Sequence, residues 1–356
     1  MEQKSVLIGM SGGVDSSVAA ALLKEQGYHV IGATMRLWTY SDSCNMKHEG
    51  CCAESAVEDA RRVCDKLGID FYVMNFKDMF KDKVVDYFVD EYIHGRTPNP
   101  CIACNKYLKF DVLLKKALAM GIDYVATGHY AKIEKGEDGK YILRASEAVK
   151  KDQSYVLYNF TQEQLAHTLM PLGGYNKDWV RQKAEELGLG VAHKPDSQEI
   201  CFVEDDDYAK FITDYSGYKP KEGDILDVNG NVIGKHRGLI YYTIGQRKGI
   251  GAYGRPMFVM KIDAENNTIT LGEKGMEFSN ELTAYDVNFV SGEFPKENML
   301  ITAKVRYQAP PAAAMLCPQK DGTVKLMFPE PQRAVTPGQA VVFYDGDIVL
   351  GGGTVL

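Results

Sequence analysis

The chain has 356 residues, of which 45% are hydrophobic, and carries a formal net charge of −7. This length predicts two or three domains with buried cores, and the lack of a run of about 18 apolar residues or of a secretory leader predicts a cytoplasmic protein with no membrane partner. The net negative charge excludes a protein that coats nucleic acid through bulk electrostatics, so any RNA contact must be local.

Short β-branched runs alternate with helical stretches over the first 205 residues. This alternation is typical of a parallel sheet covered by helices. Buried strands are expected at residues 6–8, 30–33, 71–74 and 124–127. Helices are expected, from apolar residues at helical spacing, at residues 16–26, 56–67, 81–94, 106–120, 162–169 and 177–187.

After residue 205, turn signals separate brief alternating runs, and hairpin turns are expected at residues 228–231, 265–267 and 345–347. The fold class is therefore α/β plus β. We expect a Rossmann-like domain with a parallel sheet at 1–205, a small mainly-β central domain at 206–272 and a C-terminal β-barrel-like domain at 273–356.

A local basic stretch lies in the expected central domain. No carboxylate occurs between Asp227 and Asp263, which predicts a contact with phosphates whatever the total charge. The cations of this stretch are Lys235, Arg237, Arg247, Lys248, Arg255 and Lys261.

The first strand leads directly into Gly-Met-Ser-Gly-Gly-Val-Asp-Ser-Ser at residues 9–17, and a helix is expected to follow. The glycines let the backbone approach an anion, Ser11 and Ser16 add hydroxyl donors, and the helix N-terminus supplies unpaired N–H groups. The order of strand, loop and helix favours a phosphate site over a plain glycine turn capped by Ser16. No Gly-Lys-Ser/Thr ends the loop, so it is not a Walker loop.

The Ser-Gly-Gly-x-Asp-Ser pattern of this loop resembles the signature of the ATP pyrophosphatases, the PP-loop family. The resemblance implies that the loop holds the β and γ phosphates of ATP, that the bond between the α and β phosphates is cleaved, and that AMP passes to a substrate oxygen. Asp15 would then help to hold Mg²⁺.

The chain has eight cysteines, which in a cytoplasmic protein indicate thiol chemistry, a metal or buried thiols rather than structural disulfides. Residues 96–100 form a rigid segment with two prolines that leads into Cys101 and Cys104 at the start of an expected helix. The helix dipole and the neighbouring Lys106 are expected to lower the pKa of the Cys104 thiol. Cys201 lies in a polar loop after the last helix of this half.

Three other interpretations of these cysteines stay open at this point. Each could be an inert buried thiol. A zinc site lacks a second Cys-x-x-Cys or a His-x₃-His to complete four ligands. Thioredoxin-like chemistry fits the Cys-x-x-Cys spacing, but the proline-rich segment and the phosphate loop do not belong to that pattern.

Several separate segments, in order along nearly the whole chain, resemble the bacterial tRNA-specific 2-thiouridylases. Besides the phosphate loop they are residues 95–100, 104–106, 126–130, 151–155, 196–197, 200–202, 243–249 and 336–344. The resemblance implies a tRNA uridine 2-sulfurtransferase.

This resemblance implies roles for individual residues. Cys104 would be the nucleophile, Cys201 would carry the persulfide, and a transient Cys104–Cys201 disulfide would follow each turnover. The residues implied for ATP are Gly9, Met10, Ser11, Gly12, Gly13, Val14, Asp15, Ser16, Met35 and Gly128. Those implied for the target base are Asn99, Pro100 and Cys101, and those implied for tRNA are His129, Lys151, Asp152, Gln153, Tyr307, Gln308 and Gln339.

The implied reaction adenylates the C2 oxygen of the wobble uridine, and persulfide sulfur then replaces that oxygen with release of AMP and pyrophosphate. The base must leave its stack to react. The implied partners are tRNA, a cysteine desulfurase or sulfur-relay protein as donor, and a cellular reductant that reopens the disulfide.

Cys101 departs from many relatives, which carry an aspartate there, so the role of that carboxylate is open in this chain. A third thiol beside the expected pair raises the hypothesis of an iron–sulfur cluster held by Cys101, Cys104 and Cys201. The remaining signals are weaker. Residues 249–254 fit a dinucleotide fingerprint but are interpreted as a basic loop beside RNA. Cys44, Cys51 and Cys52, near His48, are interpreted as ordinary thiols. Cys64 and Cys317 are interpreted as packing residues.

Two other functions stay open from the sequence. Another PP-loop adenylating ligase would share the phosphate loop but would need neither paired cysteines nor an RNA-facing β region. A non-catalytic RNA-binding or redox module would have no need for an intact loop.

Overall fold

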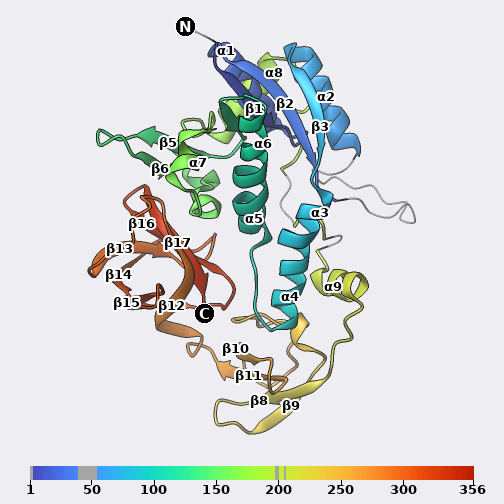
Figure 1. The fold of residues 1–356 in the computed structure, drawn as a ribbon. Coiled ribbons are helices and arrows are strands. Elements are labelled where there is room, and N and C mark those ends of the chain that lie inside the picture. The colour runs from blue at the N-terminus through green and yellow to red at the C-terminus, as the bar shows by residue number, and fades with distance from the viewer. Residues whose placement is uncertain (1–2, 39–53, 197–199, 204–205) are drawn as a thin grey trace.

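The computed structural model describes residues 3–38, 54–196, 200–203 and 206–356. Within these ranges the chain forms three sheets in succession: a parallel sheet at the N-terminal end, a small mixed sheet and a closed antiparallel barrel (Figure 1). The expected fold class is confirmed. No helix in these ranges has the length and apolar character needed to cross a membrane.

The parallel sheet has the order β3 (Asp70–Asn75), β2 (His29–Arg36), β1 (Ser5–Gly9), β4 (Tyr124–Ala126) and β7 (Thr168–Leu169). All its described pairings are parallel, and the four predicted strands are confirmed. One face packs against α1 (Val14–Glu25), α2 (Glu54–Leu67) and α8 (Lys177–Glu186). The other packs against α6 (Leu113–Ala119), which explains why β1 is buried on both faces.

One predicted helix of this domain was wrong in part, and one hairpin was not predicted. The helix expected at 162–169 ends early, as α7 (Gln162–Ala166), because Thr168 and Leu169 extend the sheet as β7 beside Val125 and Ala126. The sequence analysis also missed a hairpin of β5 (Ala131–Lys135) and β6 (Tyr141–Ala145).

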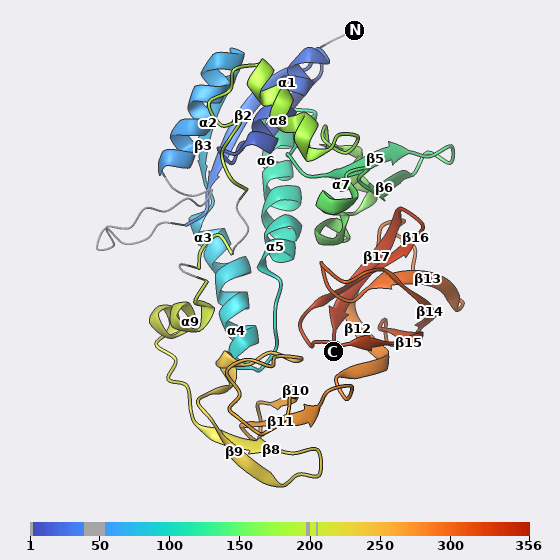
Figure 2. The same ribbon diagram turned by 180° about the vertical axis from the view of Figure 1, so that it is seen from behind.

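The two longest helical rods run side by side from the sheet towards the second domain (Figure 2). The first joins α3 (Lys77–Phe80), the π-helical η1 (Lys81–Asp86) and α4 (Tyr87–Ile93). The second joins α5 (Pro100–Ala103), the π-helical η2 (Cys104–Val112) and α6. Both expected helices are confirmed, and each starts a few residues earlier than predicted. Short 3₁₀ turns in the described part of the chain are η3 (Val149–Lys151), η4 (Ser154–Leu157) and η5 (Leu239–Tyr241).

The second unit begins with a helix that the sequence analysis missed, α9 (Tyr208–Ser216). Its sheet has the order β10 (Met257–Asp263), β11 (Thr268–Glu273), β8 (Gly223–Leu226) and β9 (Val232–His236). The hairpins expected at 228–231 and 265–267 connect β8 to β9 and β10 to β11.

The third unit is a closed barrel. Its strands are β12 (Phe278–Phe289), β13 (Met299–Lys304), β14 (Ala312–Pro318), β15 (Val324–Arg333), β16 (Ala340–Asp345) and β17 (Ile348–Val355). Pairing of β12 with β17 closes the ring, and the turn expected at 345–347 joins β16 to β17. β17 also pairs with β6, so the missed hairpin links the barrel to the first domain.

Candidate functional site

The phosphate loop follows β1 and ends where α1 begins. Gly12 has φ +72°, and a Cβ there would lie 2.3 Å from the carbonyl oxygen of Ala56, so only glycine fits this turn. The residue before α1 is Gly13, and no side chain caps the first turn. The backbone N–H groups of that turn are therefore available to an anion.

The predicted ATP residues come together at the carboxyl edge of the sheet. After β1 the chain continues to β2 on one side of the sheet, and after β4 it continues to β7 on the other side. The topological switch point, where α/β folds bind nucleotides, therefore lies between β1 and β4. Met35 lies near the end of β2, and Gly128 follows β4. A Cβ on Gly128 would lie 2.7 Å from the Ser16 nitrogen and 2.8 Å from the Asp15 carbonyl carbon. The close approach requires glycine and leaves a backbone-lined cradle that suits a phosphate chain.

Asp15 belongs to a network of charges beside the loop. It accepts a 2.7 Å hydrogen bond from the Tyr130 hydroxyl, and its two oxygens lie 2.7 and 2.8 Å from the Lys177 ammonium. Lys177 also lies 2.6 Å from Asp196, which in turn lies 2.7 Å from Lys151. Burial opposes ionisation of Asp196, but hydrogen bonds from Lys151 and Lys177 hold the pKa of its carboxyl below the usual value.

Lys177 was not among the residues predicted for the site, although the sequence held one signal for it. Asn176 caps α8 by accepting from the Trp179 nitrogen, which places Lys177 at the first position of that helix. A cation is unfavourable there because the positive end of the helix dipole lies beside it.

The helix that carries Cys101 and Cys104 starts at a well-formed cap. Asn99 Oδ1 accepts hydrogen bonds from the Cys101 and Ile102 nitrogens at 3.1 and 3.2 Å, and Pro100 occupies the first turn. Cys104 is buried and begins the π-helical stretch, a geometry frequent at functional sites, whereas Cys101 is exposed.

Lys106 was expected to act on the Cys104 thiol, but its ammonium pairs with a carboxylate of the barrel. Its ammonium lies 2.6 Å from the Asp286 carboxylate on β12, so it joins the helix to the barrel. The positive charge of Lys106 is therefore largely matched by the Asp286 carboxylate.

Cys201 is half-buried and packs against the same apolar cluster that contains Cys104. The next residue, Phe202, is 1% exposed and holds this segment in the core. The centroid of its ring lies 5.2 Å from that of Phe88 and 5.6 Å from that of Phe80. Cys104 and Cys201, which are far apart in the sequence, thus share one core.

No three His, Cys, Asp or Glu side chains gather to hold a metal ion within the described ranges. The structure therefore adds no support to a cluster on Cys101, Cys104 and Cys201. The segment with Cys44, Cys51, Cys52 and His48 lies outside the described residues. Cys64 is buried, and this burial raises the pKa of its thiol to about 12, as expected for a packing residue.

Several residues of the segment 129–153 that are predicted to contact tRNA have partners within the protein. Gln153 Oε1 accepts from the Tyr130 nitrogen at 3.0 Å. His129 Nδ1 lies 2.7 Å from Thr127 Oγ1, and burial, with a smaller contribution from Lys109, lowers the pKa of its imidazole well below the usual value. His129 is therefore neutral at physiological pH. The Asp152 carboxylate accepts from the Ser146 and Ser154 backbone nitrogens.

The barrel reaches the same region. Gln339 donates to the carbonyl oxygen of Thr97 at 2.8 Å and so supports the segment that leads to Cys101. Tyr307 and Gln308 are exposed, and the Tyr307 hydroxyl donates to the Asp152 carbonyl oxygen at 3.1 Å.

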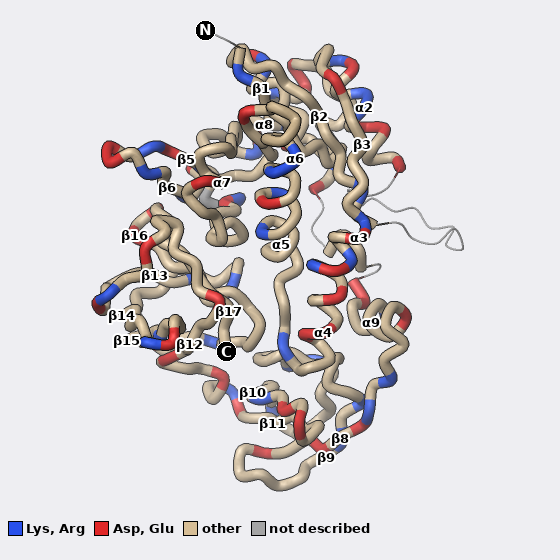
Figure 3. The backbone as a smooth tube through the Cα atoms, in the orientation of Figure 1, with Lys and Arg blue, Asp and Glu red and all other residues tan. Residues whose placement is uncertain are grey.

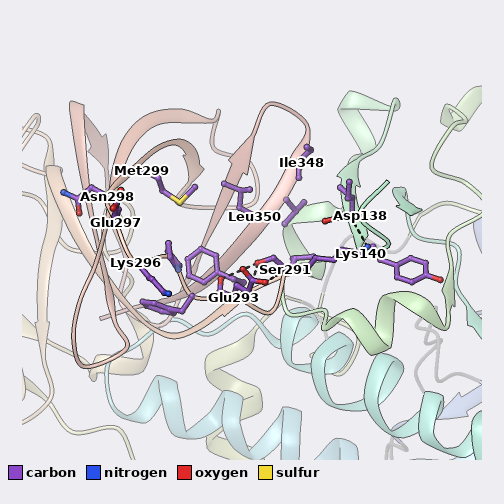
Figure 4. A pocket seen from close by; sticks show the side chains of 17 residues that line it. Asp138, Lys140, Ser291, Glu293, Lys296, Glu297, Asn298, Met299, Ile348 and Leu350 are labelled. Carbon is purple, nitrogen blue, oxygen red and sulfur yellow. Dashed lines mark hydrogen bonds and ion pairs between the residues drawn. The ribbon is translucent and has the colours of Figure 1, made fainter. Parts of the chain in front are cut away.

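Two clefts flank these elements. One, of about 800 Å³, lies between β6, the β12–β13 connection and β17, and it contains none of the predicted site residues (Figure 4). The other, of about 340 Å³, lies between the Cys104 helix and the barrel and includes Asn99. Of these two clefts, the smaller is the one lined by a residue predicted for the site.

The basic stretch of the central domain is partly neutralised, because Lys and Arg lie beside Asp and Glu there (Figure 3). Lys235 pairs with Asp224 and Arg255 with Glu273, both at 2.6 Å, which the local sequence could not show. Arg247 and Lys248 are exposed in a loop. Residues 249–254 open no helix, in agreement with their interpretation as a loop.

The fold and the loop define a nucleotide-binding α/β domain followed by two β domains. Three family models match in order: a tRNA methyl transferase HUP domain over residues 4–205, a tRNA methyl transferase PRC-barrel domain over 209–273 and an aminomethyltransferase beta-barrel domain over 279–355. The chain is 59% identical to a tRNA-specific 2-thiouridylase of Acetivibrio thermocellus, with all of both chains covered, and 58% identical to one of Clostridioides difficile, covering 99% of this chain and 98% of the relative.

The chain belongs to the tRNA-specific 2-thiouridylase family. A solved 4-thiouridine synthetase–RNA complex with bound ATP matches 59% of this chain and 50% of its own with 17% identity and a TM-score of 0.38, too weak a likeness to carry an argument.

Proposed function

We propose that this protein is a tRNA uridine 2-sulfurtransferase that consumes ATP and a cysteine persulfide. Family membership supports the reaction. One structural observation supports the roles that we give to the phosphate loop and to Cys201. The ion pairs Asp15–Lys177 and Lys177–Asp196 tie the phosphate loop to the segment that leads, five residues later, to Cys201. Direct ion pairs therefore link the loop that would bind ATP to the segment that leads to the sulfur-carrying cysteine.

In the first half-reaction, the C2 oxygen of uridine attacks the α-phosphorus of ATP. A bond forms between that oxygen and phosphorus, the bond to the β-phosphate oxygen breaks, and pyrophosphate leaves as the uridine N3 proton is lost. The N–H groups at the start of α1 stabilise the negative charge on the phosphates. Asp15 has the hard oxygen ligands that Mg²⁺ prefers and would hold that ion, which neutralises phosphate charge when bound.

In the second half-reaction, the terminal sulfur of a persulfide on Cys201 forms a bond to C2, and AMP leaves with the original oxygen. Cys104 attacks the inner sulfur of Cys201, which frees the thiolated base, or attacks before the transfer and frees the sulfur. Either order reduces the sulfane sulfur by two electrons and leaves a Cys104–Cys201 disulfide. A cellular dithiol must reduce this disulfide before the next turnover, and a cysteine desulfurase or relay protein must renew the persulfide.

The RNA would approach along the side where Tyr307 and Gln308 face solvent, with Asn99, Pro100 and Cys101 against the everted base. His129, Lys151, Asp152, Gln153 and Gln339 would position or contact the RNA around it. We assign the catalytic domain to residues 1–205, the central domain to 206–272 and the tRNA-binding barrel to 273–356.

The test incubates the protein with ATP, Mg²⁺, unmodified tRNA and a persulfide donor, and nucleoside mass spectrometry then measures 2-thiouridine. Cys104→Ser and Cys201→Ser should each abolish thiolation while ATP binding persists, and Cys317→Ser, on strand β14, serves as the matched control. A fully active Cys104→Ser enzyme would refute the scheme. AMP release that does not depend on tRNA would favour another adenylating ligase.

The same preparation tests the iron–sulfur hypothesis. Protein purified without oxygen, free of iron and fully active would exclude a cluster on Cys101, Cys104 and Cys201.

A further inference from the structure

Lys177 is a buried cation in a costly position. Its side chain is 11% exposed, it occupies the first position of the ten-residue helix α8, and it lies between two carboxylates. Burial of a cation and its position beside the positive end of a helix dipole are both energetically unfavourable. Such a placement persists only where other interactions offset it, and here Asp15 and Asp196 do so at 2.6 to 2.8 Å.

The position of Lys177 relative to the loop suggests what the cation is for. Asp15 is the second residue of α1, so the ammonium lies beside the helix end on which phosphates would bind. An ammonium has three donors, and Asp15 and Asp196 use them in this structure. Those directed to Asp15 can turn to a phosphate oxygen while the bond to Asp196 is kept.

We propose that Lys177 is a phosphate-binding residue of the nucleotide site, held in place by Asp196 and released from Asp15 when the nucleotide binds. The proposal rests on the proposed ATP-dependent function and deepens it. Its ligand is the β- and γ-phosphate part of ATP, because the loop that Asp15 borders is the part of the site assigned to those groups. Asp196 is a positioning residue, since it acts through Lys177.

A second lysine near the loop differs from Lys177. The Lys194 ammonium lies 3.2 Å from the Gly12 carbonyl oxygen and 2.9 Å from Asp59 on α2. These contacts join a backbone carbonyl of the loop to a carboxylate on α2, and a carbonyl oxygen cannot itself bind a phosphate oxygen. Lys194 therefore has a structural role, whereas Lys177 contacts the proposed magnesium ligand itself.

The experiment measures the affinity of the purified full-length protein for MgATP and for AMP by calorimetry, without tRNA or sulfur. Lys177→Met should weaken ATP binding about tenfold or more, as expected for a lost hydrogen bond between charged groups. AMP, which lacks the β and γ phosphates, should bind with less than a twofold change. Lys177→Arg should restore part of the ATP affinity. Lys183→Met, on the same helix and paired with Glu25, is the matched control.

Unchanged ATP affinity in Lys177→Met would overturn the proposal, and so would an equal loss for ATP and AMP, which would indicate a structural role. Should Lys177→Met not fold, Lys177→Arg compared with Lys177→Gln carries the same comparison. A wild-type protein that binds neither nucleotide would overturn the ATP site and this inference together. A wild type that binds ATP but makes no thiouridine would overturn only the proposed reaction.

Discussion

Replacing Gly128 with alanine should selectively damage the nucleotide site. The added Cβ would lie 2.7 Å from the Ser16 nitrogen and 2.8 Å from the Asp15 carbonyl carbon, where ordinary contact begins at 3.4 Å. The start of α1 must therefore move by roughly 0.7 Å, an overpacking strain that typically costs about 1 to 3 kcal/mol. If that strain falls on the phosphate-binding geometry, ATP affinity drops about 5- to 150-fold.

Titration with MgATP measures this loss, and thermal unfolding without nucleotide measures how much of the strain destabilises the fold instead. Gly174→Ala is the matched control, because a Cβ there meets nothing within 4 Å. ATP affinity and thermal stability that both match the wild type would show that Gly128 does not press on the loop, and the geometric argument for the cradle would be wrong.

Three further outcomes are expected. Gly12→Ala should lower thermal stability and ATP affinity, because the added Cβ clashes with Ala56. The control is Gly27→Ala, with φ +88° and open space around it, which should show only the backbone strain of about 1 kcal/mol. Equal effects of the two substitutions would contradict the clash. Phe202→Ala should destabilise the protein by about 3 to 5 kcal/mol in chemical denaturation and slow sulfur transfer, while Phe294→Ala, which is 40% exposed, should change neither. His129, whose folded pKa lies well below 6.5, binds its proton more readily when unfolded, so stability should fall as the pH drops below about 6.5, and His129→Gln should remove that part of the slope in unfolding measured between pH 7.5 and 5.5.

Local patterns were sufficient for much of the site. The phosphate loop could be placed from residues 9–17 because strand, glycines and helix start are adjacent in the chain. Asn99 and Pro100 likewise form a cap from neighbouring residues, and the hairpin turns of the β half depend on short runs of Asn, Gly and Asp. The α/β fold class follows from the same kind of local periodicity.

Contacts between residues that are far apart in the sequence could not be predicted from these local patterns. Thr168 and Leu169 read as the end of a helix, and only pairing with β4 makes them a strand. Lys106 looked like a partner for Cys104 two residues away, but Asp286, 180 residues further on, binds its ammonium. Lys235 and Arg255 seemed unopposed until the fold brought Asp224 and Glu273 beside them.

The sequence by itself determined the chemistry that is available: a loop shaped for phosphates, two cysteines in distinctive settings and the family to which the chain belongs. Only the tertiary structure decided which charges meet, because an ion pair forms between side chains within a few ångströms whatever their separation along the chain. Lys177 shows the difference most clearly, since nothing beside it in the sequence reveals that it lies between Asp15 and Asp196.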